Sequence, residues 1–113
     1  MAKWPRALVP AAAQASTSWK GTSSTAWSTA ANWTAGVPTA SVDAIIGDTN
    51  FTGANQPGIS ANAKCLSLTL GAGTKAATLT VSRALTVSGS LTIGTNGTIS
   101  HTAAKVISLT GNW

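Results

Sequence analysis

The chain has 113 residues, which is enough for one domain with a single modest core. Charged residues make up only 8% of it, and Ser, Thr, Ala, Gly and Asn stand where a helical protein carries Lys and Glu, so the composition excludes a helix bundle. Seven basic residues against two acidic ones give a formal net charge of +5. The basic residues are scattered singly along the chain and form no cluster that could follow a phosphate backbone. Their distribution therefore argues against a nucleic-acid interface.

Residues 1–15 form a leader of different composition. Lys3 and Arg6 precede a short apolar run, and Ala13-Gln14-Ala15 matches the small-x-small pattern that signal peptidase cleaves. We therefore expect secretion, with an Ala/Pro-rich leader of no such role as the alternative, since Pro10 interrupts the run. No other stretch approaches the roughly 20 apolar residues of a membrane span.

Residues 16–62 form a zone rich in Trp, Asn, Gly and Pro. Its tryptophans are Trp19, Trp27 and Trp33, and a Gly-Val-Pro turn follows them. Apolar and other residues then alternate over 42–46, which predicts a first strand there.

Residues 63–113 alternate aliphatic and hydroxyl side chains, as expected of short strands with one buried face. Glycine-containing turns separate the runs, so each strand is short. Stacked coils of such strands bury aliphatic ladders that one coil cannot bury alone, which predicts an all-β solenoid; a small β-sandwich remains the alternative. The alternating aliphatic positions are Leu66, Leu68, Leu70, Leu79, Val81, Leu85, Val87, Leu91, Ile93, Ile107 and Leu109.

A resemblance to a known class of protein runs through residues 16–113. The series Trp19-Lys20-Gly21, Trp27, Asn32-Trp33, Gly36-Val37-Pro38 and Asp43 resembles the N-terminal cap and first coils of bacterial autotransporter-passenger-like secreted β-helix surface proteins. The resemblance implies a right-handed parallel β-helix with a Trp-rich N-terminal cap, placed outside the cell or at its surface. The closing Leu109-Thr110-Gly111-Asn112-Trp113 looks like the start of another repeat, which implies self-association through open solenoid ends or the remainder of a longer chain as the partner.

Candidate catalytic residues are few. Asp43 and Asp48 are the carboxylates, His101 is the histidine and Cys65 is the cysteine. Glycoside cleavage needs two acids that flank the bond. Asp43 and Asp48 could lie near each other, but we expect Asp43 to hold a turn or a loop by a hydrogen bond. A serine triad needs a nucleophile motif that this sequence lacks. We expect no catalytic, cofactor-binding or metal site, a small buried thiol at Cys65, and a solvated histidine at a strand end.

These observations leave three functional hypotheses. The first is a non-catalytic extracellular structural or adhesive protein, either a β-solenoid spacer or a self-assembling filament subunit. The second is a carbohydrate-binding module, in which Trp19, Trp27 and Trp33 contact a glycan instead of closing the solenoid. The third is the N-terminal fragment of a polysaccharide-active β-helix enzyme.

Overall fold

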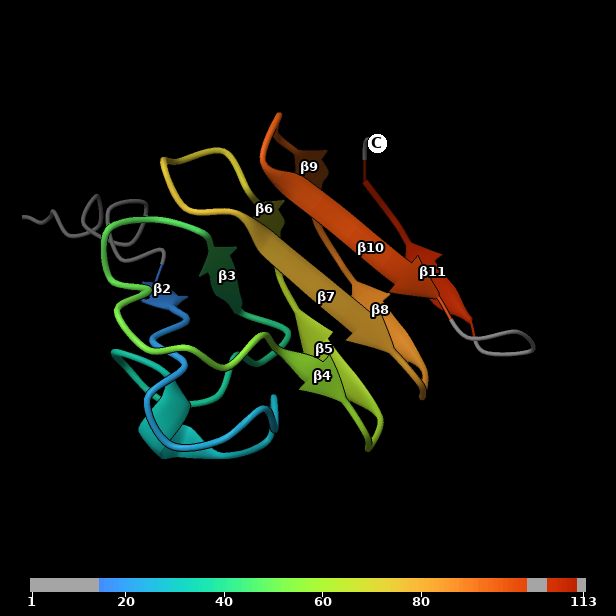
Figure 1. The fold of residues 1–113 in the computed structure, drawn as a ribbon. Helices are drawn as coiled ribbons and strands as arrows, with labels where there is room; N and C mark the ends of the chain where they lie inside the picture. The colour runs from blue at the N-terminus through green and yellow to red at the C-terminus, as the bar shows by residue number, and fades with distance from the viewer. Residues whose placement is uncertain (1–14, 102–105, 112–113) are drawn as a thin grey trace, which may run out of the picture.

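The computed structural model describes residues 15–101 and 106–111, and these fold into three parallel sheets (Figure 1). The sheets have the strand orders β2-β3-β6-β9, β4-β7-β10 and β5-β8-β11. The elements are β2 (Ala15–Ser18), the 3-10 turn η1 (Ala30–Asn32), β3 (Val42–Ile46), β4 (Gly58–Ile59), β5 (Ala63–Cys65), β6 (Leu68–Leu70), β7 (Ala77–Val81), β8 (Leu85–Val87), β9 (Leu91–Ile93), β10 (Gly97–His101) and β11 (Ile107–Leu109).

The strands repeat as coils, each of which gives one strand to each sheet. Coil 1 contains β3, β4 and β5, coil 2 contains β6, β7 and β8, and coil 3 contains β9, β10 and β11. Each ladder that joins two of the described strands is parallel, and equivalent positions such as Ala44, Leu68 and Leu91 pair in register. The predicted β-solenoid is therefore confirmed and the sandwich is excluded, while the right-handed sense of the coil stays a prediction.

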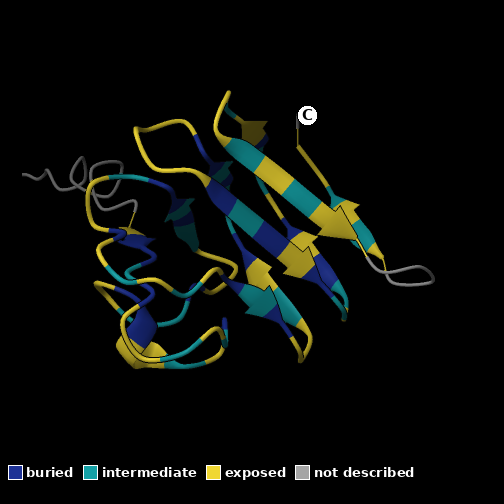
Figure 2. Ribbon diagram, viewed as in Figure 1, coloured by how far each residue is buried: buried dark blue, intermediate teal, exposed yellow. Residues whose placement is uncertain are grey.

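The core consists of in-register rows of inward side chains. One row runs from Ala63 through Leu85 to Ile107, and the other rows are built in the same way. Burial alternates along the strands, as Figure 2 shows for β7, because the outward positions carry hydroxyl residues such as Thr80. A leucine that is fully buried, as Leu85 is, stabilises the fold by about 1.5–3 kcal/mol.

Glycines form the corner between the first and second sheets. Gly47, Gly71 and Gly94 each follow the last residue of their strand, at stacked positions in the three coils. Gly47 and Gly71 have φ of +105° and +71°, which side-chain-bearing residues rarely adopt. A Cβ on Gly71 would also overlap the backbone of Gly97. Backbone conformation and the close approach of neighbouring coils therefore both require glycine at Gly47 and Gly71, and close approach alone requires it at Gly94.

The structure differs from the predicted strands in two places. The alternation over Leu66, Leu68 and Leu70 predicts one strand, but β5 ends at Cys65 and β6 begins at Leu68 in another sheet. The alternation continues around this corner, so it cannot reveal the break. Likewise β10 begins at Gly97, although the sequence predicts turns at the glycines between the apolar runs.

Two predicted features fall at the ends of the chain. The leader up to residue 14 and Trp113 lie outside the described residues, whereas Ala15 is the first residue of β2 and pairs with Val42. Over residues 15–101 and 106–111, no helix has the length and hydrophobicity needed to cross a membrane.

Candidate functional site

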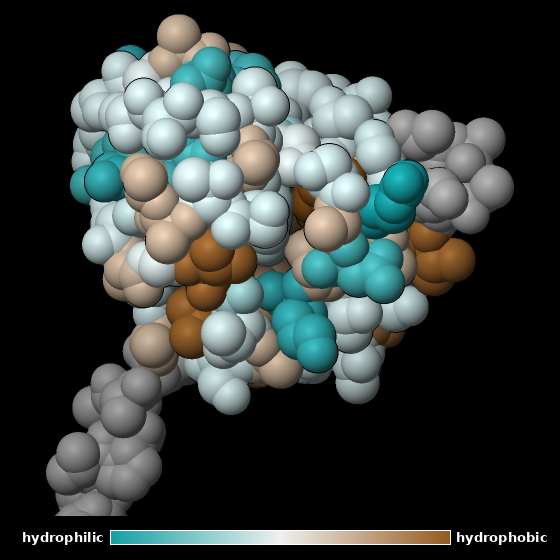
Figure 3. Space-filling view, turned by 90° about the horizontal axis from the view of Figure 1, so that it is seen from below, coloured by the Kyte–Doolittle hydropathy of each residue, from teal (hydrophilic) through white to brown (hydrophobic). Residues whose placement is uncertain are grey.

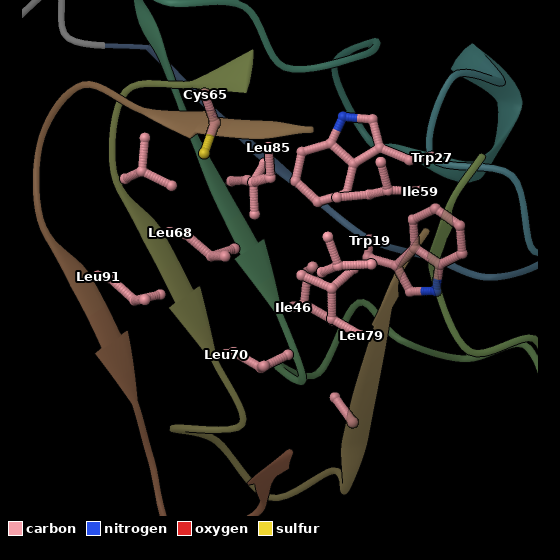
Figure 4. Packing of buried hydrophobic residues seen from close by; sticks show 14 of the residues in the cluster. Trp19, Trp27, Ile46, Ile59, Cys65, Leu68, Leu70, Leu79, Leu85 and Leu91 are labelled. Carbon is pink, nitrogen blue, oxygen red and sulfur yellow. The ribbon is translucent and has the colours of Figure 1, made fainter. Parts of the chain in front are cut away.

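The three tryptophans lie at the end of the solenoid where coil 1 begins. Ser18 pairs with Ile45, which places Trp19 above Ile46 in its row, and Trp19 donates its backbone N–H to the Ile45 carbonyl at 2.9 Å. A parallel bridge between Ala26 and Gly58 likewise places Trp27 above Ile59. Figure 4 shows the rings of Trp19 and Trp27 at one side of the cluster, with Leu91 at the opposite side.

The rings form a packed aromatic group. Trp33 meets Trp19 and Trp27 edge to face, with ring centroids 5.1 and 4.9 Å apart and interplanar angles of 81° and 73°. This arrangement is favoured by the quadrupoles of aromatic rings. Trp33 Nε1 donates to the Trp27 carbonyl and Trp19 Nε1 to the Asn55 carbonyl, each at 2.8 Å. Two of the three indole N–H groups are thus satisfied inside the protein.

Three inward positions of coil 1 carry smaller side chains than the same positions of coil 2. Ala44 and Cys65 stand in rows where coil 2 has Leu68 and Val87, and Ala63 stands where coil 2 has Leu85. These smaller residues belong to the same close-packed core as the three indoles, with Ala63 at its margin. We define the tryptophan cap as Trp19, Trp27 and Trp33 with the loop that carries them.

Asn32 holds the loop of the tryptophan cap. Its side chain is fully buried, and Oδ1 accepts the backbone N–H groups of Ser23 and Ser24, each at 2.9 Å. Nδ2 donates to Ser24 Oγ and to the Ala26 carbonyl, each at 3.0 Å. All four bonding positions of this amide are used, so Asn32 fixes the path of the segment that carries Trp27.

The outer edge of β2 is closed by the chain that follows the tryptophans. Thr34 donates its N–H to the Ser18 carbonyl at 2.9 Å, and its Oγ1 accepts the Ser18 N–H at 3.0 Å. The buried Thr17 hydroxyl donates to the Gly36 carbonyl at 2.8 Å and accepts the Ala35 N–H at 3.0 Å. Because the Ser18 backbone groups are paired and the Thr17 hydroxyl holds Ala35 and Gly36 beside the strand, β2 presents no free backbone edge at Ser18.

Burial of the rings bears on the glycan hypothesis. The exposed fractions of Trp19, Trp27 and Trp33 are 0%, 2% and 2%, so none of them presents the open ring face on which a sugar stacks. Trp27 Nε1 is buried and has no hydrogen-bond partner. An unsatisfied donor of this kind costs about 1–3 kcal/mol, which the packing of the large ring offsets.

The two carboxylates hold loops and corners. Asp43 Oδ1 accepts the Ser67 N–H at 3.0 Å, at the corner between β5 and β6. Asp48 accepts the Ser18 hydroxyl at 2.8 Å and the Asn50 N–H at 2.9 Å. Both carboxylates belong to coil 1 and its loop, whereas the exposed His101 ends β10 in coil 3. In the described part of the chain, no three His, Cys, Asp or Glu side chains are placed to share a metal ion.

Cys65 is a core residue. Its side chain is fully buried, and it pairs in register with Val87. Burial raises the pKa of the thiol to about 12, and the nearby charge of Asp43 acts in the same direction. The reactive thiolate is therefore scarce at neutral pH, and the residue serves as a small hydrophobe.

A shallow pocket of about 130 Å³ lies between the loop after β3 and the loop before β7. Phe51, Gln56 and Lys75 contribute to its lining. Gln56 is engaged with coil 2, because its Oε1 accepts the Thr78 N–H at 2.8 Å. The volume is well below the roughly 300–1,000 Å³ of ligand sites, so the pocket suits solvent better than a substrate.

The chain was compared with curated proteins, solved structures and protein families. Searches of curated proteins and of solved structures found no match. One family's sequence profile matches residues 18–109, from the last residue of β2 to the last residue of β11, and so includes the tryptophan cap and all three coils. The chain therefore belongs to the family described as a domain of unknown function (DUF8693).

Proposed function

We propose that this chain is a non-catalytic structural element of the bacterial surface, a capped β-solenoid that acts as a rigid spacer. The observation that carries the proposal is the architecture, in which stacked parallel coils end at a closed, buried tryptophan cap. Such solenoids are quasi-one-dimensional, because each coil contacts only its neighbours. The number of coils therefore determines the distance between the two ends.

The polar side chains support a structural role. Asn32, Asp43 and Asp48 use their oxygens to hold loops and corners, as described above. The buried Cys65 thiol has a pKa raised to about 12, which removes it as a nucleophile at neutral pH. These residues stabilise the coil, and the proposal assigns them no chemistry.

The surface supports a place outside the cell. Only 8% of the chain is charged. Figure 3 shows a face dominated by pale residues of intermediate hydropathy, with strongly hydrophilic ones in separate patches. The order of cap and ladders is what the resemblance to autotransporter-passenger-like proteins leads us to expect, so secretion is part of the proposal.

Between the two structural roles, the cap favours the spacer over the filament. A head-to-tail fibre needs two open ends, whereas at the β2 end the Ser18 backbone groups are already paired and the Thr17 hydroxyl is bonded to the Gly36 carbonyl. A glycan-binding role has less support, because the three indole faces are covered.

Lengthening the solenoid tests the spacer role. Three extra copies of residues 68–90, inserted between Ser90 and Leu91, preserve the register in which Leu68 pairs with Leu91. Each added coil should lengthen the particle by about 4.8 Å, or about 14 Å in total, measured by small-angle X-ray scattering. Unchanged length or loss of the β-sheet circular dichroism signal would count against a rigid ladder.

A second measurement tests the absence of ligand chemistry. The purified chain should show no binding on a glycan array and no release of reducing sugar from polysaccharides. Hydrolysis that disappears on a conservative surface substitution would overturn the non-catalytic proposal. Specific glycan binding that disappears in the same way would overturn the purely structural role.

A further inference from the structure

Asn96 and Gly97 form a chemically labile pair. Among the asparagines of the sequence, Asn96 is the one whose next residue is glycine. Deamidation begins when the backbone nitrogen of the next residue attacks the side-chain carbonyl carbon of the asparagine, and a Cβ on that next residue obstructs the attack. Because glycine has no Cβ, deamidation of this chain is chemically easiest at Asn96.

The pair lies in the turn that joins β9 to β10. Asn96 is exposed, so water reaches its side chain. The turn stacks on the loop between β6 and β7, where the Asn96 N–H donates to the Gly71 carbonyl at 3.0 Å and Nδ2 donates to the Gly73 carbonyl at 2.8 Å. Both the backbone and the side chain of Asn96 are therefore held against coil 2.

The peptide group between Asn96 and Gly97 is also held on both sides. Its carbonyl accepts the N–H of Ala77, the first residue of β7, at 3.0 Å, and its N–H donates to the Gly94 carbonyl at 3.1 Å. For the attack, the Gly97 nitrogen must lose its proton and meet Cγ of Asn96, and the carboxamide must turn toward it. These movements break hydrogen bonds described above, so the folded turn keeps the reacting atoms apart.

We propose that Asn96 is a deamidation site that the stacked coils keep closed and that opens when the β9–β10 turn separates from coil 2. In the open turn, the Gly97 nitrogen bonds to Asn96 Cγ and ammonia leaves, which gives a cyclic imide. Water then opens the imide at one of its two carbonyl groups, and the product is aspartate or isoaspartate. The hydrogen bonds that close the site lie within the turn or run to coil 2, so they are the same whatever lies beyond coil 3. The site is independent of the spacer role.

Neither product fits the stacked turn. Aspartate replaces the Nδ2 donor with a carboxylate oxygen, which is an acceptor and repels the Gly73 carbonyl that Nδ2 contacts now. Isoaspartate adds a carbon atom to the main chain directly before Gly97, where even a Cβ on Gly97 would overlap the Leu70 carbonyl. Deamidation therefore hinders the turn from stacking on coil 2 again, which makes the opening one-way.

Incubation of the full chain in mildly alkaline buffer, followed by peptide mapping with mass spectrometry, tests whether the folded site is closed. We expect deamidation of Asn96 to be about tenfold or more slower in the folded chain than in urea that unfolds it, because the reaction needs the open turn. Asn62 is exposed and is followed by alanine, so it reports the background rate in the same samples. Equal rates at Asn96 in the two conditions would overturn the proposal.

Loosening coil 3 tests the opening step. Leu91 is buried on β9, and Leu91→Ala should raise the rate of Asn96 deamidation in buffer by about tenfold. Thr92→Ala changes the exposed neighbour on the same strand and should leave the rate unchanged. Circular dichroism checks the fold of both variants. If Leu91→Ala does not fold, urea steps below the unfolding midpoint loosen the unaltered chain instead; a rate that stays constant across these steps would contradict the requirement for opening.

Asn96→Asp tests the effect of the product. This variant should lower the thermal midpoint, because it loses the donor to Gly73. The matched control is Asn62→Asp, since Asn62 Oδ1 accepts the Ala84 N–H and a carboxylate oxygen accepts it equally well. The control should keep the thermal midpoint of the unaltered chain. If both variants lower it equally, the one-way character of the site is refuted.

Discussion

Replacing Asn32 with alanine should destabilise the tryptophan cap strongly. The change removes the four hydrogen bonds of the side chain and leaves two backbone groups without partners, the N–H groups of Ser23 and Ser24, whereas the Ala26 carbonyl still accepts the Thr29 N–H. Each abandoned buried group costs about 1–3 kcal/mol. Because Ser23 is itself exposed, we take the low end for each and expect about 2 kcal/mol in total.

Urea unfolding followed by tryptophan fluorescence measures this loss directly. A domain of this size typically has about 5–15 kcal/mol of stability, so the midpoint should fall visibly. At about 4 °C or more per kcal/mol, the thermal midpoint should fall by about 8 °C.

The matched control is Asn62→Ala. Asn62 is exposed, and its Oδ1 accepts one N–H, that of Ala84 at 3.3 Å, so its removal should cost less than about 1 kcal/mol. If the two variants lose equal stability, the account of Asn32 as the residue that holds the cap is refuted.

Three further predictions concern buried groups. Trp27→Phe removes an N–H donor that has no partner, whereas Trp33→Phe removes the 2.8 Å hydrogen bond from Trp33 Nε1 to the Trp27 carbonyl. In urea unfolding, Trp33→Phe should therefore be the more destabilising of the two by about 1 kcal/mol. At Gly71 an alanine would combine positive φ with a backbone overlap, whereas at Gly36 it would meet positive φ but open space. Gly36→Ala should lower the free energy of unfolding by about 1 kcal/mol, and Gly71→Ala should lower it far more. Equal losses would contradict the stacking argument. The buried Cys65 thiol should react with a thiol reagent at pH 8 only after unfolding. Since its folded pKa of about 12 exceeds the unfolded value, stability should fall as pH rises above about 9, and Cys65→Ala should flatten this slope.

The fold could be predicted from the sequence because the solenoid repeats its signal. Each of β7, β8 and β9 shows period-2 alternation bounded by a glycine or a polar turn, and the structure places a strand at each. The corner at Leu66 and Ser67 could not be predicted, because no glycine or proline marks it and the alternation runs through. There the Ser67 N–H bonds to Asp43, a residue of the preceding coil.

The tryptophan cap was predictable in kind but not in detail. Clustered tryptophans near the start of a ladder indicated the residues that close the end. Nothing in the sequence distinguishes Asn32, which is fully buried, from the exposed Asn50 and Asn62. Its importance arises from a loop that closes around it, and such a contact is visible only in three dimensions.

The position of the cap also sets an order for folding. The cap lies before coil 1 in the chain, so it leaves the ribosome first, and its contacts with Ile46, Asn55 and Gly58 are complete once coil 1 is nearly made. Each later coil then needs only the coil before it as a template. Synthesis and folding can thus proceed in the same direction, one coil at a time, and little of the apolar ladder waits uncovered for a distant partner.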